Sequence, residues 1–102
     1  MSNLDERLKK GSFVISKAGH DRGEILIVLD FNEQFAYLAD GKRRLARKPK
    51  KKKLIHLQVT KSYSMRCAQE LSEGTLPDNS VISKEISQYA AKVNKGEISG
   101  EK

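Results

Sequence analysis

The hydrophobic pattern of this chain of 102 residues changes near Thr60. Before Thr60, short runs rich in β-branched residues alternate with turn-forming residues, which is typical of strands. After it, apolar residues recur at the three- and four-residue spacing of a helix. The change predicts a β-rich unit over residues 11–60 and a helical appendage over residues 61–96, between a polar segment at 1–10 and a flexible tail at 97–102.

Three strands are expected in the first part of the β-rich unit. β-branched and aromatic residues mark them at 13–15, 24–30 and 35–39. Asp40 and Gly41 then form a dipeptide that is typical of a hairpin turn.

Two more strands are expected beyond this turn. The fourth spans residues 43–47, with Leu45 as its inward anchor, and Pro49 excludes regular ladder pairing around it. Residues 50–53 are expected to form an exposed, extended loop. The fifth strand is formed by Leu54, Ile55, Leu57 and Val59. Five short strands with tight turns predict a small barrel, because a closed sheet has no free edges.

Two short helices are expected after Thr60. Cys67, Ala68 and Leu71 share one face of the first, which should end at residues 72–74. A second helix should begin at residues 78–80, which include good N-cap residues, and end near Gly96. Its apolar stripe consists of Ile82, Ile86, Tyr89, Ala90 and Val93. We expect this stripe to pack on the barrel or on the first helix, and a groove for a partner is the alternative.

Nine basic side chains lie between Lys42 and Lys53, with no acid among them. Of the chain's 20 Lys and Arg residues, the other 11 stand against 13 Asp and Glu, a balance of −2, so this run accounts for the whole net charge of +7. The run consists of Lys42, Arg43, Arg44, Arg47, Lys48, Lys50, Lys51, Lys52 and Lys53. A nucleic acid fits such a patch, because neutralised phosphates release their condensed counterions.

Two other interpretations of the basic run remain open. A lysine run is often a solvated loop, and it can also meet acidic lipid headgroups. No amphipathic helix or lipidation signal adjoins the run, so we expect no membrane partner. Residues 1–10 are polar and the longest apolar run, 25–29, is too short to cross a membrane, so a cytoplasmic location is expected.

A loop with two glycines lies between the first two expected strands. Gly19 and Gly23 should adopt positive φ angles in this tight turn. Lys17 and Arg22 project from the same loop, where a guanidinium can bind a phosphate bidentately; an ordinary solvated loop is the alternative.

Aromatic residues are few, and this affects how RNA would be read. We expect Phe13, Phe31, Phe35 and Tyr37 to supply core material, which leaves at most one or two free to stack on bases. Contacts should therefore favour phosphates, shape and 2′-hydroxyl groups over base identity.

No catalytic or metal site is expected. The single cysteine, Cys67, excludes an internal disulfide and makes no zinc-ligand spacing with His20 or His56, so it should be a small buried residue. The neighbours His20 and Asp21 do not define a hydrolase triad, because a triad is a matter of geometry and no strand-elbow motif is present. We expect neither a cofactor nor a small-molecule substrate.

The expected first two strands and the loop between them resemble a KOW motif, with Gly23 at the position of its glycine. The segments 39–44, 49–52 and 56–60 are similar to those of bacterial KOW-domain RNA-binding proteins. Those proteins are in turn similar to KOW-type large-subunit ribosomal proteins of archaea and eukaryotes.

The resemblance implies a five-stranded SH3-like barrel that binds RNA and associates with ribosomes, without enzymatic activity. Ribosomal RNA of the large subunit is the implied partner, and contacts with ribosomal proteins are compatible with it. Lys17, His20 and Arg22 lie in the motif loop, where such domains commonly touch RNA or protein. The alternative function is a protein-interaction module that docks on transcription or translation machinery, with the Tyr89 stripe as its surface if that stripe is exposed.

Overall fold

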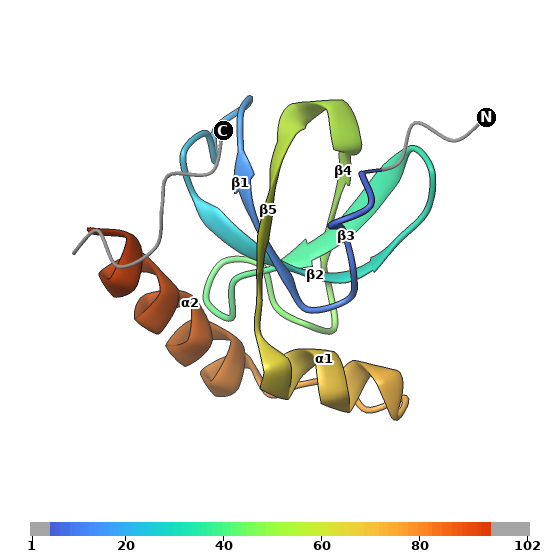
Figure 1. Cartoon of the computed structure of the whole chain (residues 1–102), viewed down its shortest axis with the longest axis vertical. Coiled ribbons are helices and arrows are strands. Elements are labelled where there is room, and N and C mark those ends of the chain that lie inside the picture. The colour runs from blue at the N-terminus through green and yellow to red at the C-terminus, as the bar shows by residue number, and fades with distance from the viewer. Residues whose placement is uncertain (1–4, 95–102) are drawn as a thin grey trace.

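The computed structural model describes residues 5–94. Within this part of the chain, five antiparallel strands form one sheet and two helices follow it (Figure 1). The elements are β1 (Ser12–Ser16), β2 (Ile25–Phe31), β3 (Phe35–Ala39), β4 (Lys50–Lys53), the short 3-10 helix η1 (Leu54–His56), β5 (Leu57–Tyr63), α1 (Met65–Ser72) and α2 (Asn79–Asn94). Their order across the sheet is β4-β3-β2-β1-β5.

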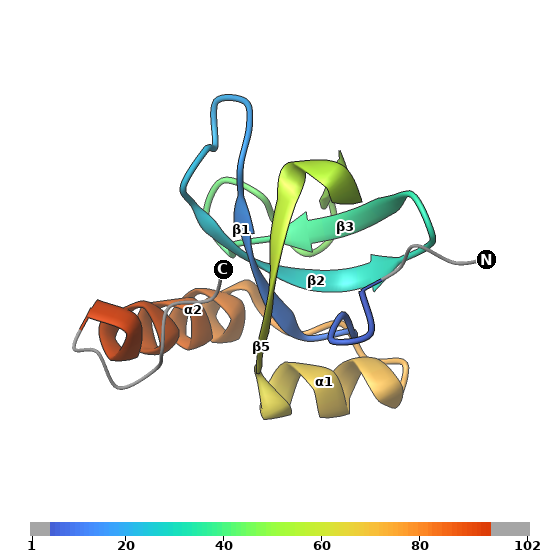
Figure 2. The same cartoon turned by 45° about the horizontal axis from the view of Figure 1, so that its top comes forward.

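The two edges of the sheet, β4 and β5, are separated in sequence only by η1. Such a short connection brings the end of one edge strand to the start of the other, so the sheet bends strongly (Figure 2). Between residues 5 and 94, no ladder of hydrogen bonds pairs β4 with β5. The structure therefore confirms five short strands followed by two helices. The strands form a strongly bent antiparallel sheet.

From Ile25 to Leu29, β2 is apolar, and both of its faces are buried there. Leu26 and Val28 point into a core cluster that also holds Val14. Ile27 and Leu29 alternate with them and join a second cluster on the opposite face. The helices pack against this second cluster.

The helices bury the faces that their spacing predicts. In α1, Cys67 is fully buried, and the hydroxyl of Ser64 caps the helix by accepting from the Cys67 N–H at 3.1 Å. In α2, Ile82 and Tyr89 are buried, and the Tyr89 ring stacks on Phe13 with 4.3 Å between centroids. The apolar stripe therefore packs on the sheet, as predicted. The expected helix end at Gly96 and the expected tail at 97–102 lie outside the described residues.

The fourth strand is not where the sequence predicts it. Residues 43–47, expected as a strand, form bends and turns, whereas residues 50–53, expected as a loop, form β4. β4 pairs with β3 in a register that sets Lys52 opposite Ala36. An edge strand tolerates lysines because its outward side chains stay in water. Pro49 directly precedes β4, so it interrupts no ladder.

Two residues expected in the core are exposed. Leu45 is 41% exposed, and its neighbour Ala46 is buried in its place. Ile55, expected on the fifth strand, lies on η1 and is 74% exposed. Both errors arise because neither residue lies in a strand: Leu45 belongs to the bends and turns at 43–47 and Ile55 to η1, so the alternation of a strand does not set their burial.

Phe35 and Tyr37 also lie outside both core clusters. The register places Phe35 opposite Lys53 and Tyr37 opposite Lys51, both of which are exposed. Their neighbour Ala36 takes the inward position. Both aromatic rings are half-buried on the outer face of the sheet.

Candidate nucleic-acid interface

The first half of the basic run lies on a loop that Asp40 organises. Asp40 Oδ1 accepts hydrogen bonds from the backbone N–H groups of Lys42, Arg43 and Arg44 at 2.8, 2.9 and 2.9 Å. The N–H groups of Asp40 and Gly41 donate in turn to the carbonyl of Arg44 at 2.9 and 3.1 Å. These bonds take the place of ladder pairing and leave Lys42 and Arg43 exposed, whereas Arg44 is partly buried.

The start of α2 holds this loop from the other side. The Ala46 N–H donates to Asn79 Oδ1 at 2.8 Å. Gly41 has a φ of +80°, and a Cβ there would overlap the backbone oxygen of Asn79. The loop therefore bonds to and packs closely against Asn79, the first residue of α2, which lies far from it in sequence.

The second half of the run is divided by strand geometry. Lys51 and Lys53 of β4 are exposed, whereas Lys50 and Lys52 are half-buried. The Lys51 ammonium lies 4.3 Å from the centroid of the Phe35 ring. Four successive lysines therefore fall into an outward pair and an inward pair.

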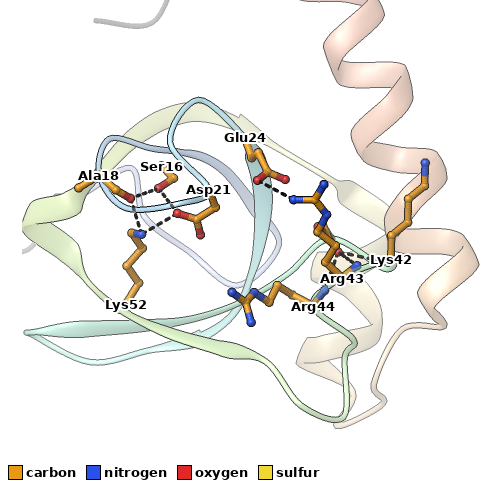
Figure 3. A network of polar contacts seen from close by, with 9 residues as sticks. Ser16, Ala18, Asp21, Glu24, Lys42, Arg43, Arg44 and Lys52 are labelled. Carbon is orange, nitrogen blue, oxygen red and sulfur yellow. Dashed lines mark hydrogen bonds and ion pairs between the residues drawn. The ribbon is translucent and has the colours of Figure 1, made fainter.

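Lys52 is committed to an internal ion pair. Its Nζ lies 2.8 Å from Asp21 Oδ1 and donates a second hydrogen bond to the Ala18 carbonyl at 2.7 Å (Figure 3). The side chains of Lys52 and Asp21 are only 9% and 12% exposed. The pair ties the loop between β1 and β2 to β4, so Lys52, which we expected to meet phosphate, has a partner within the protein.

Asp21 is held as a carboxylate by its neighbours. Burial acts to raise the pKa of Asp21, but hydrogen bonds from Lys52 and from the Ser16 hydroxyl, together with the charge of Lys52, leave that pKa below its ordinary value. Its Oδ2 is buried and accepts no hydrogen bond from the described residues. The Asp21 carboxylate therefore holds the loop between β1 and β2 in place.

The loop between β1 and β2 has the geometry that its glycines predict. Gly19 and Gly23 adopt φ angles of +87° and +88°. A Cβ at Gly23 would meet no atom within 4 Å, so the backbone angle is the reason for glycine there. Lys17, His20 and Arg22 are exposed, as a binding loop requires.

The two loops meet around a small cavity of about 50 Å³, which His20, Asp21, Arg43 and Arg44 help to line. Arg43 reaches across to Glu24 at 3.7 Å, but its side chain remains 79% exposed (Figure 3). Its guanidinium is therefore near the loop between β1 and β2 and still open to solvent.

Most of the predicted phosphate-binding residues are accessible. Among the nine of the basic run, the exposed ones are Lys42, Arg43, Arg47, Lys48, Lys51 and Lys53. Arg44, Lys50 and Lys52 are partly buried. The structure thus brings Arg43 and Arg44 to the loop that carries His20, and it places Lys51 and Lys53 on the outer face of an edge strand.

The internal role of Lys52 was not found from the sequence. The available signal was the two-residue alternation of a strand, but it applies only once residues 50–53 are recognised as one. The aromatic rings on the outer face were missed for the same reason.

Residues 5–94 contain no group of three or more His, Cys, Asp or Glu side chains placed to hold a metal ion. In the same range, neither helix is long and apolar enough to cross a membrane. The chemistry of the interface is that of exposed cations on an ordered framework.

Comparison with known proteins finds no family model and no curated protein that matches this chain.

Proposed function

We propose that this protein binds RNA and associates with the ribosome, through ribosomal RNA of the large subunit, as a cytoplasmic binding protein without enzymatic activity. The observation that carries the proposal is the set of exposed cationic side chains on two ordered segments, the loop 41–48 and β4, beside the loop 17–23. Clustered Lys and Arg on a framework are the electrostatic footprint of a nucleic-acid partner.

We further propose that the bent sheet is an SH3-like barrel of the KOW type. Two features support this. Only η1 lies between the edge strands β4 and β5. Gly23 has a positive φ in the loop between β1 and β2, at the place of the motif glycine.

Phosphate contacts provide most of the affinity in this proposal. If about five of the exposed cations meet phosphates, the binding constant falls with salt with a log-log slope of about −3.5 to −4.5. Lys17, His20 and Arg22 add contacts at the neighbouring loop.

The alternative, a protein-interaction module that uses the Tyr89 stripe, loses that surface. Tyr89 is 4% exposed and stacks on Phe13 within the core. Docking on transcription or translation machinery would need another face.

A charge-reversal pair of variants tests the proposal. The first carries Lys48→Glu, Lys51→Glu and Lys53→Glu, and the control carries Lys61→Glu, Lys84→Glu and Lys92→Glu, which change the net charge equally at exposed positions elsewhere. We expect the first variant to lose affinity for ribosomal RNA and its salt slope to become shallower by about 1 for each lysine. Equal slopes for the two variants would contradict the assignment of the interface.

Sedimentation through a sucrose gradient tests the ribosomal partner. The tagged protein in lysate should move with large subunits at low salt and return to the top of the gradient after nuclease treatment. The first charge-reversal variant should stay at the top, whereas the control variant should sediment. Residence of the unaltered protein at the top of every gradient would count against ribosome binding.

A further inference from the structure

A groove of about 650 Å³ opens beside β4. It includes one face of Phe35, whose ring also lies 4.3 Å from the Lys51 ammonium. It lies among the end of β1, the start of β3, η1 and the start of β5. The lining residues used here are Lys17, Gln34, Phe35, Lys53, Ile55 and Gln58. Its volume is within the range of small-molecule sites, about 300–1,000 Å³.

The groove exposes apolar surface that the core does not need. Ile55 is 74% exposed, and Phe35 lines the groove while lying outside both core clusters. Apolar and aromatic surface in a concave site is typical of a place where a ligand binds. A flat, partly apolar group suits it.

The polar groups of the groove suit the edge of a nucleobase. Gln34 and Gln58 each offer an amide that both donates and accepts hydrogen bonds. Such groups can bond the donors and acceptors of a base without demanding one identity.

The groove also carries positive side chains that suit the phosphates flanking such a base. Lys17 and Lys53 lie on its lining, and Lys53 continues the exposed face of β4. Two carboxylates also line it: Asp5 is paired with Arg7 at 2.8 Å, and Glu33 is exposed. Lys17 and Lys53 therefore supply positive charge on the lining for flanking phosphates.

We propose that this groove takes up one unpaired nucleobase of the RNA that the protein binds, with Phe35 and Ile55 against the base and with Lys17 and Lys53 on its flanking phosphates. This inference rests on the proposed function and deepens it. A base held in a duplex cannot enter the groove, so the ligand is a nucleotide of a bulge or loop. The interface then combines phosphate contacts with a stacking site.

Three RNA hairpins with the same stem test the inference. One is fully paired, one carries a single 2-aminopurine bulge, and one carries an abasic bulge that keeps the phosphate and removes the base. We expect the full-length protein to bind the 2-aminopurine hairpin about tenfold more tightly than the other two. Its binding should also quench the 2-aminopurine fluorescence, because the base stacks.

Two exposed positions provide a matched pair of variants, since Ile55 and Met65 are both 74% exposed. Ile55→Ser should abolish the tenfold preference, whereas Met65→Ser should keep it. Phe35→Leu, used where its circular dichroism matches that of the unaltered protein, should abolish the quenching. The affinity for the paired hairpin should be the same for all these proteins.

The inference fails if the three hairpins bind equally, if the abasic bulge binds as tightly as the base, or if Ile55→Ser keeps the preference. In each of these cases the paired hairpin is still bound, so the proposed RNA-binding function survives. If no hairpin is bound at any salt concentration, the proposed function fails together with the groove.

Discussion

At the scale of single residues, Lys52 differs from the lysines on either side of it. Lys51 and Lys53 point to solvent, whereas Lys52 meets Asp21 in a pair that is almost excluded from water. Removing one partner of a buried pair leaves the other charge without compensation, which costs more than the pair itself contributes. Replacing the whole run therefore changes the framework as well as the interface.

We predict that Lys52→Met lowers the free energy of unfolding at pH 7 by about 3 kcal/mol, because it leaves the Asp21 carboxylate buried and unpaired. Lys51→Met, on the exposed face of the same strand, should change it by less than about 0.5 kcal/mol. Urea denaturation followed by circular dichroism measures both.

The pH dependence of the difference in unfolding free energy between the unaltered protein and Lys52→Met identifies its cause. The pKa of Asp21 is lower in the folded protein than in the unfolded chain, so its stabilising effect is present above the unfolded pKa and is lost as the pH falls through the folded pKa. The gap between the unaltered protein and Lys52→Met should therefore narrow below about pH 4. Asp5, whose pKa is also lowered, by hydrogen bonds from Arg7, is present in both proteins and cancels. A gap that stays constant from pH 7 to pH 3 would show that packing of the lysine stem, rather than the ion pair, is responsible.

At the scale of elements, the start of α2 supports the basic loop. Gly41 has a positive φ and lies against the Asn79 backbone, and the Asn79 side chain accepts from the Ala46 N–H. The start of α2 therefore supports a loop whose backbone does not pair with a neighbouring strand.

We predict that Gly41→Ala destabilises the protein by roughly 2 kcal/mol more than Gly74→Ala. Both glycines have a φ of +80°, so both variants carry the cost of a left-handed backbone. Only at Gly41 does a Cβ also overlap another element, whereas at Gly74 it meets no atom within 4 Å. Thermal and urea denaturation give the two values, and equal losses would mean that the loop does not press on α2.

At the scale of the whole molecule, the helices complete the core of the sheet. Phe13, Ile27 and Ile82 come from β1, β2 and α2, and they belong to one buried cluster with Tyr89. The outer side of the bent sheet would otherwise expose apolar residues to water.

We predict that Tyr89→Ala lowers the free energy of unfolding by about 3–4 kcal/mol, because it removes a buried ring and its stacking on Phe13. Gln88→Ala, next to it on the exposed side of α2, should change it by less than about 0.5 kcal/mol. Urea denaturation compares the two variants. If Tyr89→Ala left stability unchanged but removed a protein partner, the stripe would be a docking surface and not part of the core.

Features with local causes could be predicted from the order of the residues alone. β-Branched runs and the glycines at 19 and 23 predict β1, β2 and the turn between them, because period-two burial and positive φ are properties of neighbouring residues. The helical spacing of Cys67, Ala68 and Leu71 predicts α1 in the same way. The excess of positive charge also needs no fold to be recognised.

The roles of the residues in the basic run follow from how the chain folds in three dimensions. Asp40 satisfies the backbone of the loop and Asn79, 33 residues after Ala46, anchors it, so the strand forms at residues 50–53 instead of 43–47. Once β4 pairs with β3, alternation buries Lys52 against Asp21 and turns Phe35 outward. The Asn79 anchor, the pairing of β4 with β3 and the Lys52–Asp21 pair depend on partners that are distant in the chain, and no local pattern records which partner will satisfy a given backbone group or charge.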